Sequence, residues 1–282
     1  MSKIEKFVMT SRVVQKWNPQ LYLRFGSQRL RPALDLLAQI DHSANPRRIA
    51  DLGCGTGNIT PFLCERWPKA EILCLDSSEE MLDRARANHL AAQGIADISK
   101  VDYQQTDFES VALDKPVDLI FSNAALHWVG FDVHRNLLPR LVSMLNTKGI
   151  IAFQIPDTRA QNSHLMMRQA MEDLGFDYHR VRWVTTEVDP DQYYNLLKPL
   201  CTQVDMWSST FVHSMQGDNP VADFTASTGL GPYVESLGGS STEEGKAFIA
   251  KYRQLINNSY PKQSDGTTLF SMKRFFLVAQ KQ

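Results

Sequence analysis

Short apolar runs alternate with segments of helical periodicity along the first half of the chain. Five runs are predicted as strands, because each is short, mostly apolar or alternating, and bounded by polar residues or glycine. They are RRIADLG (47–53), AEILCLDS (70–77), VDYQQTD (101–107), VDLIFSNA (117–124) and GIIAFQIP (149–156). Helical patterns lie between them. This order predicts parallel βαβ units in a doubly wound sheet.

The clearest helix follows the second strand. In SSEEMLDRARANHLAAQG (77–94), Ser77 or Ser78 can cap the N-terminus, acidic residues fill the first turn, and Gly94 can end the helix. The helix expected after the fourth strand contains Pro139, which predicts a kink or a later start.

The pattern changes after Pro156. Residues 157–202 are predicted as helices and loops, and GLGPYVESLGGSST (229–242) as a loop around a short helix. QVDMWSSTFVHSM (203–215) and TLFSMKRFFLVAQ (268–280) alternate like strands. Two late strands would complete a seven-stranded, mostly parallel sheet with helical insertions beside it.

Composition and charge narrow the class of protein. A chain of 282 residues suits one large domain with a full core. The net charge of −1 leaves no strongly basic face, which argues against nucleic acid as a partner. No apolar run approaches the roughly 18 residues of a membrane-spanning helix, and MSKIEKFVMTSRVVQ (1–15) lacks the apolar centre of a signal peptide. The four cysteines have no CxxC or Cys–His metal spacing, which predicts reduced thiols in the cytoplasm and no metal site.

The stretch DLGCGTGNIT (51–60) places Gly53, Gly55 and Gly57 directly after the first strand. Such glycines let the chain turn sharply and let a ligand lie against the backbone at the start of a helix. The third glycine comes one residue earlier than in the dinucleotide string G-x-G-x-x-G. Asp51, ahead of the loop, would repel a pyrophosphate and attract an ammonium or a sulfonium. The loop therefore favours S-adenosylmethionine (SAM) over NAD; a purely structural turn is the alternative.

Two further acids end the next two strands. Asp76 follows Gly57 at about the twenty-residue distance at which a carboxylate meets ribose hydroxyls; it could instead cap the next helix. Met81 is expected on the adenine face or in the core. Asp107, followed by Phe108, is placed to accept from the adenine amino group, although an aspartate there is also a common turn residue. These acids share the strand ends where ligands bind in open α/β sheets.

Several strings together resemble the class I SAM-dependent methyltransferases. They are DLGCGTGN, LDSSEEML, TDF, DLIFSNAALHWV and LNTKGIIAFQIPD. Within that class, the stretches WNPQLYLRFGSQRLRPALDLL, IPDTRAQNSHLMMRQAM and TASTGLGPY are similar to the trans-aconitate methyltransferase family, from about Trp17 to Ala279. The resemblance implies an α/β Rossmann-like fold, with a seven-stranded mostly parallel sheet and helical insertions that form a cap.

The resemblance also implies how the chain is organised. Residues 1–12 are expected to be a disordered tail, and 13–45 a helical lid. Residues 46–156 are expected to form the SAM-binding Rossmann-like half, and 157–282 the cap insertions with the two closing strands. All of them would form one structural domain.

The predicted cofactor is SAM, without a metal. The residues expected to bind it are Asp51, Gly53, Gly55, Gly57, Asp76, Ser77, Met81, Asp107, Phe108, Asn123 and Ala124. In the resemblance Asp76 is the ribose acid, Asp107 and Phe108 are the adenine pair, and Asn123 and Ala124 lie under the methionine part.

The expected reaction is an in-line methyl transfer to a carboxylate of a small organic acid, most simply trans-aconitate, giving a monomethyl ester. Carboxylic acids are ionised near neutral pH, so no general base is required. The predicted substrate residues are His127, Trp128, Arg29, Arg31 and Tyr22. Each has a plain alternative: a turn histidine, a core tryptophan, surface ion pairs for the arginines, and packing for the tyrosine. Arg180 and Arg182 are more typical of surface charges.

Three other functions remain open at this stage. One is methylation of a different carboxylic acid or small molecule. Another is an NAD-dependent dehydrogenase, which would show a later third glycine and no leading acid. The third is a SAM-binding protein without catalysis. The sequence does not indicate the oligomeric state.

Overall fold

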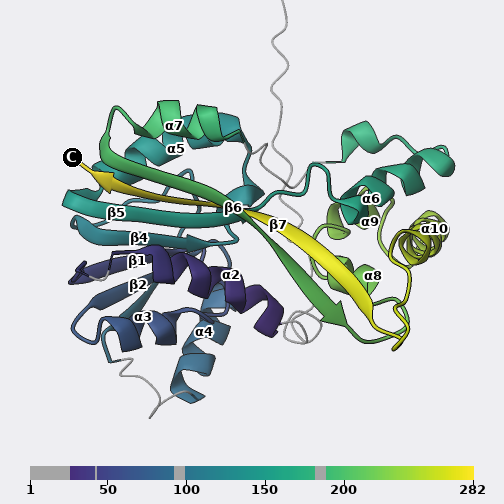
Figure 1. Ribbon diagram of the computed structural model, residues 1–282, viewed down its shortest axis with the longest axis horizontal. Helices are drawn as coiled ribbons and strands as arrows, with labels where there is room; N and C mark the ends of the chain where they lie inside the picture. Colours follow the sequence, from purple (N-terminus) through teal and green to yellow (C-terminus); the bar gives the residue numbers. More distant parts are fainter. Residues whose placement is uncertain (1–25, 42, 92–98, 182–188) are drawn as a thin grey trace, which may run out of the picture.

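The computed structural model describes residues 26–41, 43–91, 99–181 and 189–282, and its centre is a seven-stranded sheet (Figure 1). The strands are β1 (Arg48–Leu52), β2 (Glu71–Asp76), β3 (Val101–Gln105), β4 (Val117–Asn123), β5 (Leu145–Pro156), β6 (Cys201–Met215) and β7 (Thr268–Lys281). Their spatial order is β3-β2-β1-β4-β5-β7-β6. Strands β1 to β5 pair in parallel, whereas β7 is antiparallel to β5 and β6. The predicted α/β fold with a mostly parallel sheet is confirmed.

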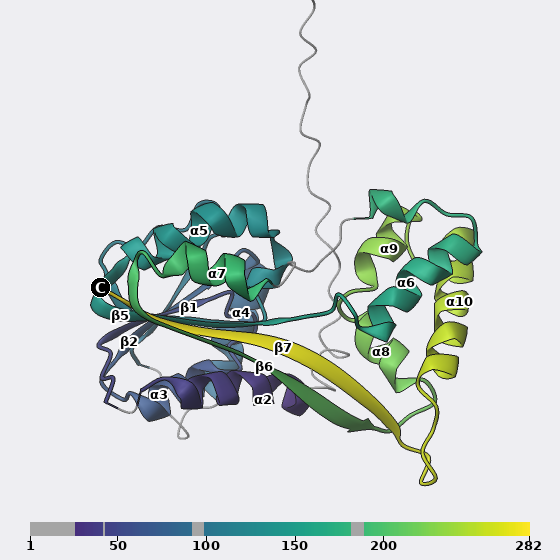
Figure 2. The ribbon, with the colours of Figure 1, turned by 45° about the horizontal axis from the view of Figure 1, so that its top comes forward.

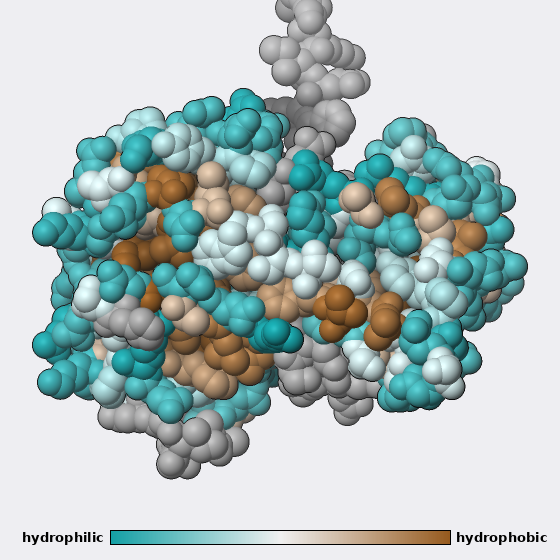
Figure 3. Space-filling model, in the orientation of Figure 1, coloured by the Kyte–Doolittle hydropathy of each residue, from teal (hydrophilic) through white to brown (hydrophobic). Residues whose placement is uncertain are grey.

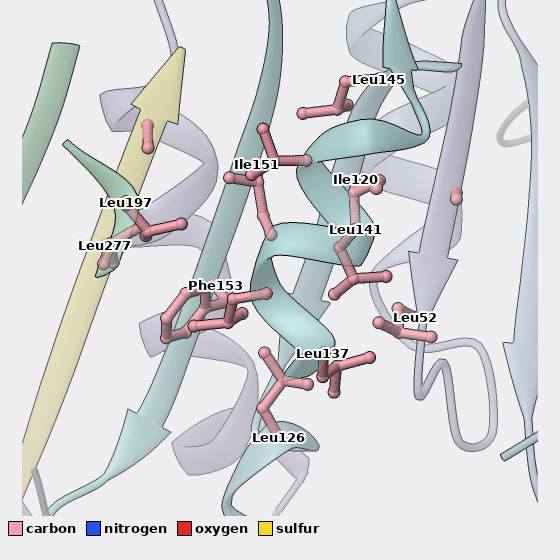
Figure 4. Close-up of a cluster of buried hydrophobic side chains, with 14 of the residues drawn as sticks. Leu52, Ile120, Leu126, Leu137, Leu141, Leu145, Ile151, Phe153, Leu197 and Leu277 are labelled. Carbon is pink, nitrogen blue, oxygen red and sulfur yellow. The ribbon is translucent and has the colours of Figure 1, made fainter. Parts of the chain in front are cut away.

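Two layers of helices cover this sheet. On one face lie α5 (Phe131–Ser143) and α7 (Pro190–Leu197), and on the other α2 (Gly26–Gln39), α3 (Thr60–Arg66) and α4 (Glu79–Ala91). Figure 4 shows Leu137 and Leu141 of α5 in the same buried cluster as Ile151 and Phe153 of β5. Each fully buried side chain of this kind contributes about 1.5–3 kcal/mol. This packing holds the carboxyl ends of the parallel strands at one edge.

Pro139 does not delay the helix that contains it. Helix α5 begins at Phe131, after Gly130 in an extended conformation, and Pro139 lies inside it. The prediction of a later start is therefore wrong. An interior proline costs about 3 kcal/mol, and the buried stripe of Leu137, Leu138 and Leu141 offsets that cost through its packing on the sheet.

The second half of the chain builds a separate lobe, the cap lobe. Strands β6 and β7 continue beyond the sheet as a two-stranded ribbon (Figure 2). On the ribbon lie α6 (Asn162–Asp173), η2 (Tyr178–Arg180), α8 (Pro220–Ala226), α9 (Gly231–Ser236) and α10 (Glu243–Ser259). These helices share a core of their own that includes Met167, Phe248, Tyr252, Phe270 and Met272. The helical insertions thus gather at one end of the sheet lobe, joined to it by the ribbon.

Helix α2 is a core element of the sheet lobe. Leu36 is fully buried and packs in one cluster with Ile49 of β1 and Phe276 of β7. The predicted lid, residues 13–45, includes α2, which packs in the core of the sheet lobe. Residues 13–25 of that lid and the predicted tail 1–12 lie outside the described residues.

The view in Figure 3 shows a mostly hydrophilic surface, with apolar patches on the sheet lobe and near the ribbon. Val212 of β6 and Leu269 of β7 are large hydrophobic residues that are exposed. Within the described part of the chain, no helix combines the length and the apolar character needed to cross a membrane.

Candidate functional site

The glycine loop after β1 packs too closely for a side chain at two of its three glycines, Gly53 and Gly57. Gly53 has φ +72°, and a Cβ built on it would lie 2.2 Å from Cβ of Ala125 and 3.8 Å from the Phe108 ring. The loop backbone is pinned to β2, because the N–H groups of Gly53 and Cys54 both donate to the carbonyl of Leu75, at 2.7 and 3.0 Å. Gly53 therefore allows the loop after β1 to touch the segments that follow β3 and β4.

A buried histidine supports the same loop from α4. Gly57 has φ +73°, and a Cβ there would lie 2.4 Å from Nε2 of His89. His89 Nε2 bonds the Gly57 carbonyl at 2.9 Å, and its Nδ1 bonds the Tyr103 hydroxyl at 2.5 Å. Burial lowers the pKa of His89, opposed by the bond to Gly57. A neutral ring therefore donates from Nε2 and accepts at Nδ1. Nothing in the sequence pattern singles out His89.

Asp51 is the acid that leads the loop, and it is almost wholly buried at 1% exposure. Its Oδ2 accepts from the Thr60 hydroxyl at 3.3 Å. Among the described residues its Oδ1 has no partner. Burial raises the pKa of Asp51, the Thr60 bond lowers it, and the charge of Asp76 raises it, to about 7. A buried carboxyl in this state is stabilised by a cationic ligand, since a nearby positive charge favours its ionised form.

Asp76 ends β2 and faces the loop. Its Oδ2 accepts from Gly55 N at 2.9 Å, and its Oδ1 from Ser78 N at 3.0 Å. Burial raises the pKa of Asp76, opposed by the bonds from these N–H groups and from Ser77. A carboxylate has about four acceptor positions, so these local bonds still leave acceptor capacity for ribose hydroxyls. Both the local and the ligand interpretation of Asp76 therefore stand.

The first turn of α4 begins beside Asp76. Ser78 caps it, accepting from Met81 N at 3.3 Å. Ser77 is exposed, and its carbonyl accepts from the Gln105 side chain at 3.0 Å. Met81 is half-buried. The capping alternatives for this helix thus resolve in favour of Ser78.

The predicted adenine pair sits in the loop after β3. Asp107 Oδ1 accepts from the N–H and the hydroxyl of Ser110 at 2.7 and 2.8 Å, so it forms the turn that the sequence offered as an alternative. Arg140 of α5 donates to the carbonyls of Phe108 and Glu109, at 2.5 and 2.6 Å. Arg140 is thus a positioning residue for Phe108, and sequence reasoning did not identify it.

The end of β4 carries backbone strain. Ala124 has φ +52°, a conformation that costs a non-glycine residue about 1–2 kcal/mol. Its N–H donates to the Gln154 carbonyl at 3.0 Å. The Gln154 side chain is fully buried and donates to Asn123 Oδ1 at 2.5 Å, and within the described residues its Oε1 has no partner. Strained segments with unsatisfied polar atoms are typical of ligand sites.

His127 and Trp128 form a single turn, η1 (Leu126–Trp128), after this strand. His127 is half-buried, and its Nδ1 is buried with no partner among the described residues. Loss of water, followed by the charges of Arg274, His164 and His134, lowers the pKa of His127 to about 3. The two rings lie 5.0 Å apart between centroids. His127 is therefore neutral near pH 7 and a weak base.

His134 of α5 holds this turn in place. Its Nε2 bonds the Leu126 carbonyl at 2.9 Å, and its Nδ1 bonds the Tyr193 hydroxyl at 2.8 Å. Burial lowers its pKa to about 4, opposed by the bond to Leu126. The neutral ring therefore donates to Leu126 and accepts from Tyr193, so α5 and α7 together fix η1.

Arg274 brings positive charge to the junction of the two lobes. It lies on β7 opposite Pro156 of β5 and Ser209 of β6, and it is only 5% exposed. Burial, then the charge of Arg274, lowers the pKa of His164 to about 4. The same two causes, with Arg31 third, lower the pKa of His213 to about 4. The charge of Arg274 thus acts on three histidines, which are His127 in the turn after β4, His164 on α6 and His213 on β6.

Arg274, His164 and His213 were not predicted as site residues, and of these only Arg274 had a signal in the sequence. In the alternation of β7, Phe270, Met272 and Phe276 are buried, and Arg274 occupies an inward position between them. Arginine is seldom buried to this degree, so a charge in an inward position of a strand is a signal that sequence alone offers.

Arg31, one of the predicted arginines, also reaches this junction. It is exposed on α2, and its guanidinium lies 5.6 Å from the Phe211 ring centroid on β6. Arg29 belongs to α2, but its side chain lies outside the described part, as do Tyr22, Arg182 and the Arg180 side chain. The described residues contain no cluster of three or more His, Cys, Asp or Glu side chains that could hold a metal ion.

Comparison with known proteins finds methyltransferase relatives of this chain. A methyltransferase domain model matches residues 49–149. A trans-aconitate 2-methyltransferase of Acidovorax ebreus is 38% identical over 94% of this chain and 98% of its own length. The Streptomyces avermitilis enzyme of the same name is 38% identical over 95% and 98%. The Escherichia coli one is 35% identical over 94% and 98%.

The fold is also that of solved methyltransferases. Geranyl diphosphate methyltransferase in complex with SAM has a TM-score of 0.50 at 16% identity, over 94% of this chain and 90% of that one. A Haemonchus contortus phospholethanolamine N-methyltransferase 2 has a TM-score of 0.50 at 13% identity, over 89% and 53%. Because the sequence relatives match nearly end to end, this chain belongs to the trans-aconitate 2-methyltransferase family.

Proposed function

We propose that this protein transfers a methyl group from SAM to a carboxylate of trans-aconitate, giving the monomethyl ester. The assignment of SAM as the methyl donor rests on Asp51, which is buried beside the glycine loop. Its Oδ1 has no partner among the described residues. The relatives' name supports the acceptor and favours position 2.

The residues around the loop fit SAM. Asp51 suits a positively charged group, and the carboxylate of Asp76 suits two ribose hydroxyls. Phe108 and Met81 would enclose the adenine, with Asp107 as acceptor and Ser77 beside it. Gly55, beside which a Cβ would meet nothing within 4 Å, leaves room for the ligand against the backbone, whereas Gly53 and Gly57 let the loop pack on Ala125 and His89. Asn123 and Ala124 would support the methionine part of the ligand. When bound, SAM supplies an electrophilic methyl group on a sulfonium.

The chain's own task is to orient an acceptor that is already ionised. A carboxylate near pH 7 needs no proton removed. His127, with a pKa of about 3, is suited to orienting rather than to base catalysis. We assign the indole of Trp128 and the imidazole of His127 to positioning the reacting carboxylate, and the packing of η1 to excluding water. Arg31, Arg29 and Tyr22 remain proposed substrate residues.

A direct assay tests the proposal. The protein incubated with SAM and trans-aconitate is expected to yield one equivalent of S-adenosylhomocysteine (SAH) per monomethyl ester, measured by mass spectrometry. Asp51→Asn is expected to abolish most of this turnover, whereas Asp114→Asn, an exposed acid paired with Arg48, should leave it unchanged. Ester formation from another acid but not from trans-aconitate would overturn the substrate and keep the chemistry.

Binding measurements address the other functions. Calorimetry should show SAM but not NAD binding. SAM binding without turnover on any of a panel of small acids would indicate a non-catalytic protein. We also propose the cytoplasm as the location, on the cysteine pattern of the sequence.

A further inference from the structure

The junction of the lobes concentrates positive charge in a protein whose net charge is −1. Arg274 and Arg31 both act electrostatically on His213. Asp157, which follows the Pro156 that pairs with Arg274, forms ion pairs with Arg159 and Lys273, each at 3.1 Å. The charge at this point therefore comes from particular side chains, as a small anionic substrate requires.

The buried surroundings of Arg274 favour an anion. Three histidines from separate elements, His127, His164 and His213, feel its charge and have lowered pKa values. They stay neutral near pH 7, so they can donate hydrogen bonds without adding to a buried cluster of cations.

Unsatisfied polar atoms lie beside this point. Pro156 pairs with Arg274, and two residues beyond it Thr158 is 3% exposed, with an Oγ1 that has no partner among the described residues. The buried Nδ1 of His127 is in the same state. Both are hydrogen-bonding atoms that a carboxylate-bearing ligand would satisfy.

We propose that Arg274, with His127 and His164 beside it, binds a carboxylate of the substrate other than the one that is methylated. The inference rests on the proposed function for the identity of the reacting carboxylate. It assigns selection for polycarboxylates to β7 and α6, which come from the closing strands and the cap lobe. A guanidinium suits this role because its two parallel N–H donors match a carboxylate.

The test is calorimetric binding of acids to the SAH-loaded protein, which requires no turnover. The probes are trans-aconitate with three carboxylates, mesaconate and glutaconate with two different pairs, and crotonate with one. Wild type should bind trans-aconitate most tightly. Arg274→Gln should raise its Kd about 10- to 100-fold, and should change the Kd less than about twofold for whichever dicarboxylate lacks the contacted group. Arg274→Lys should fall between the two.

The controls separate binding from folding. Arg253→Gln removes an arginine that pairs with Asp223 elsewhere in the cap lobe, and should leave every Kd unchanged. The Kd for SAH and the melting temperature should stay as in wild type in the arginine variants. If Arg274→Gln does not fold, His164→Asn on α6 provides the test, with the same dependence on the acid.

Each outcome decides the inference. A uniform loss for all four acids, or no loss for any, would overturn it. Preference of wild type for crotonate would also overturn it. Polycarboxylate binding that depends on Arg274 without ester formation would leave the inference standing and reject the proposed function. Ester formation that is equally efficient in Arg274→Gln would do the reverse.

Discussion

Burial of Asp51 disfavours the ionised carboxylate that a cationic ligand requires. Its pKa of about 7 means that the ligand-free protein holds a proton there at acidic pH. A carboxyl whose pKa is raised on folding contributes stability that is present below its unfolded pKa and is lost as the pH rises through the folded value. The unliganded protein is therefore destabilised near and above pH 7 by this one group, and a cationic ligand reverses that.

This linkage predicts a pH-dependent affinity for SAM. A cation binds the ionised carboxylate, so the SAM Kd is expected to rise by up to about tenfold for each pH unit below 7 and to be flat above it. Asp51→Asn should bind weakly at every pH, with a much shallower dependence. Calorimetric titrations between pH 5.5 and 8.5 provide the measurement. An unchanged slope in the variant would assign the pH dependence to another group.

Two glycines of the loop provide a matched pair. Gly53→Ala places a Cβ against Ala125 at a positive φ, so it is expected to destabilise the protein by about 2–4 kcal/mol and to remove SAM binding. Gly55→Ala also has a positive φ but nothing within 4 Å, so the expected cost is about 1 kcal/mol. Urea unfolding of both variants distinguishes close packing from conformation; equal losses would contradict the packing argument.

Elements act on the site mainly by fixing the turn η1. His134 is the connection, since it ties Leu126 to Tyr193 and thereby to α7. His134→Phe removes the imidazole bond to the Leu126 carbonyl, which still accepts from the Val129 N–H at 3.2 Å. It also takes the imidazole partner from the buried Tyr193 hydroxyl, for an expected loss of about 2–4 kcal/mol. Tyr193→Phe removes one bond and should cost about 1 kcal/mol.

The same pair of variants separates the two ligand sites. Because η1 carries His127 and Trp128, His134→Phe should raise the KM for the acid several-fold while the SAM Kd changes little. Thermal denaturation and steady-state kinetics measure the two effects. A loss of SAM binding as large as the loss of acid binding would mean that η1 supports the glycine loop instead.

Elements were largely predictable from local pattern. All seven strands follow from short apolar or alternating runs, and Ser78 and the acidic first turn of α4 follow from capping rules. Pro139 was the exception: a local rule predicted a kink or a later helix start, and the later start is wrong because tertiary burial stabilises the α5 stripe from Phe131 onward. The local pattern did not predict that β6 and β7 run beyond the sheet, because the part beyond it packs on the cap helices, which are distant in sequence.

At the scale of the whole molecule, the ribbon of β6 and β7 joins two lobes that have separate buried clusters. The cap core contains Phe248, whereas the loop that fits SAM is built on the sheet lobe. Phe248→Ala is therefore expected to cost about 3–5 kcal/mol in the cap lobe. Acid binding should weaken, and SAM binding should remain within about twofold of wild type. Calorimetry with each ligand checks this, and equal loss of both would show that the lobes unfold together.

The sequence by itself determined the strands, the order of the parallel units, the glycine loop and the acids in series behind it. These features depend on neighbours in the chain, so periodicity and spacing capture them. Tertiary structure alone decided that Arg274 of β7, His164 of α6 and His127 share one electrostatic environment. It also decided that His89 and Arg140 hold the loops of the proposed cofactor site. Such contacts join residues far apart in sequence, and only strand register and the packing of the cap lobe bring them together.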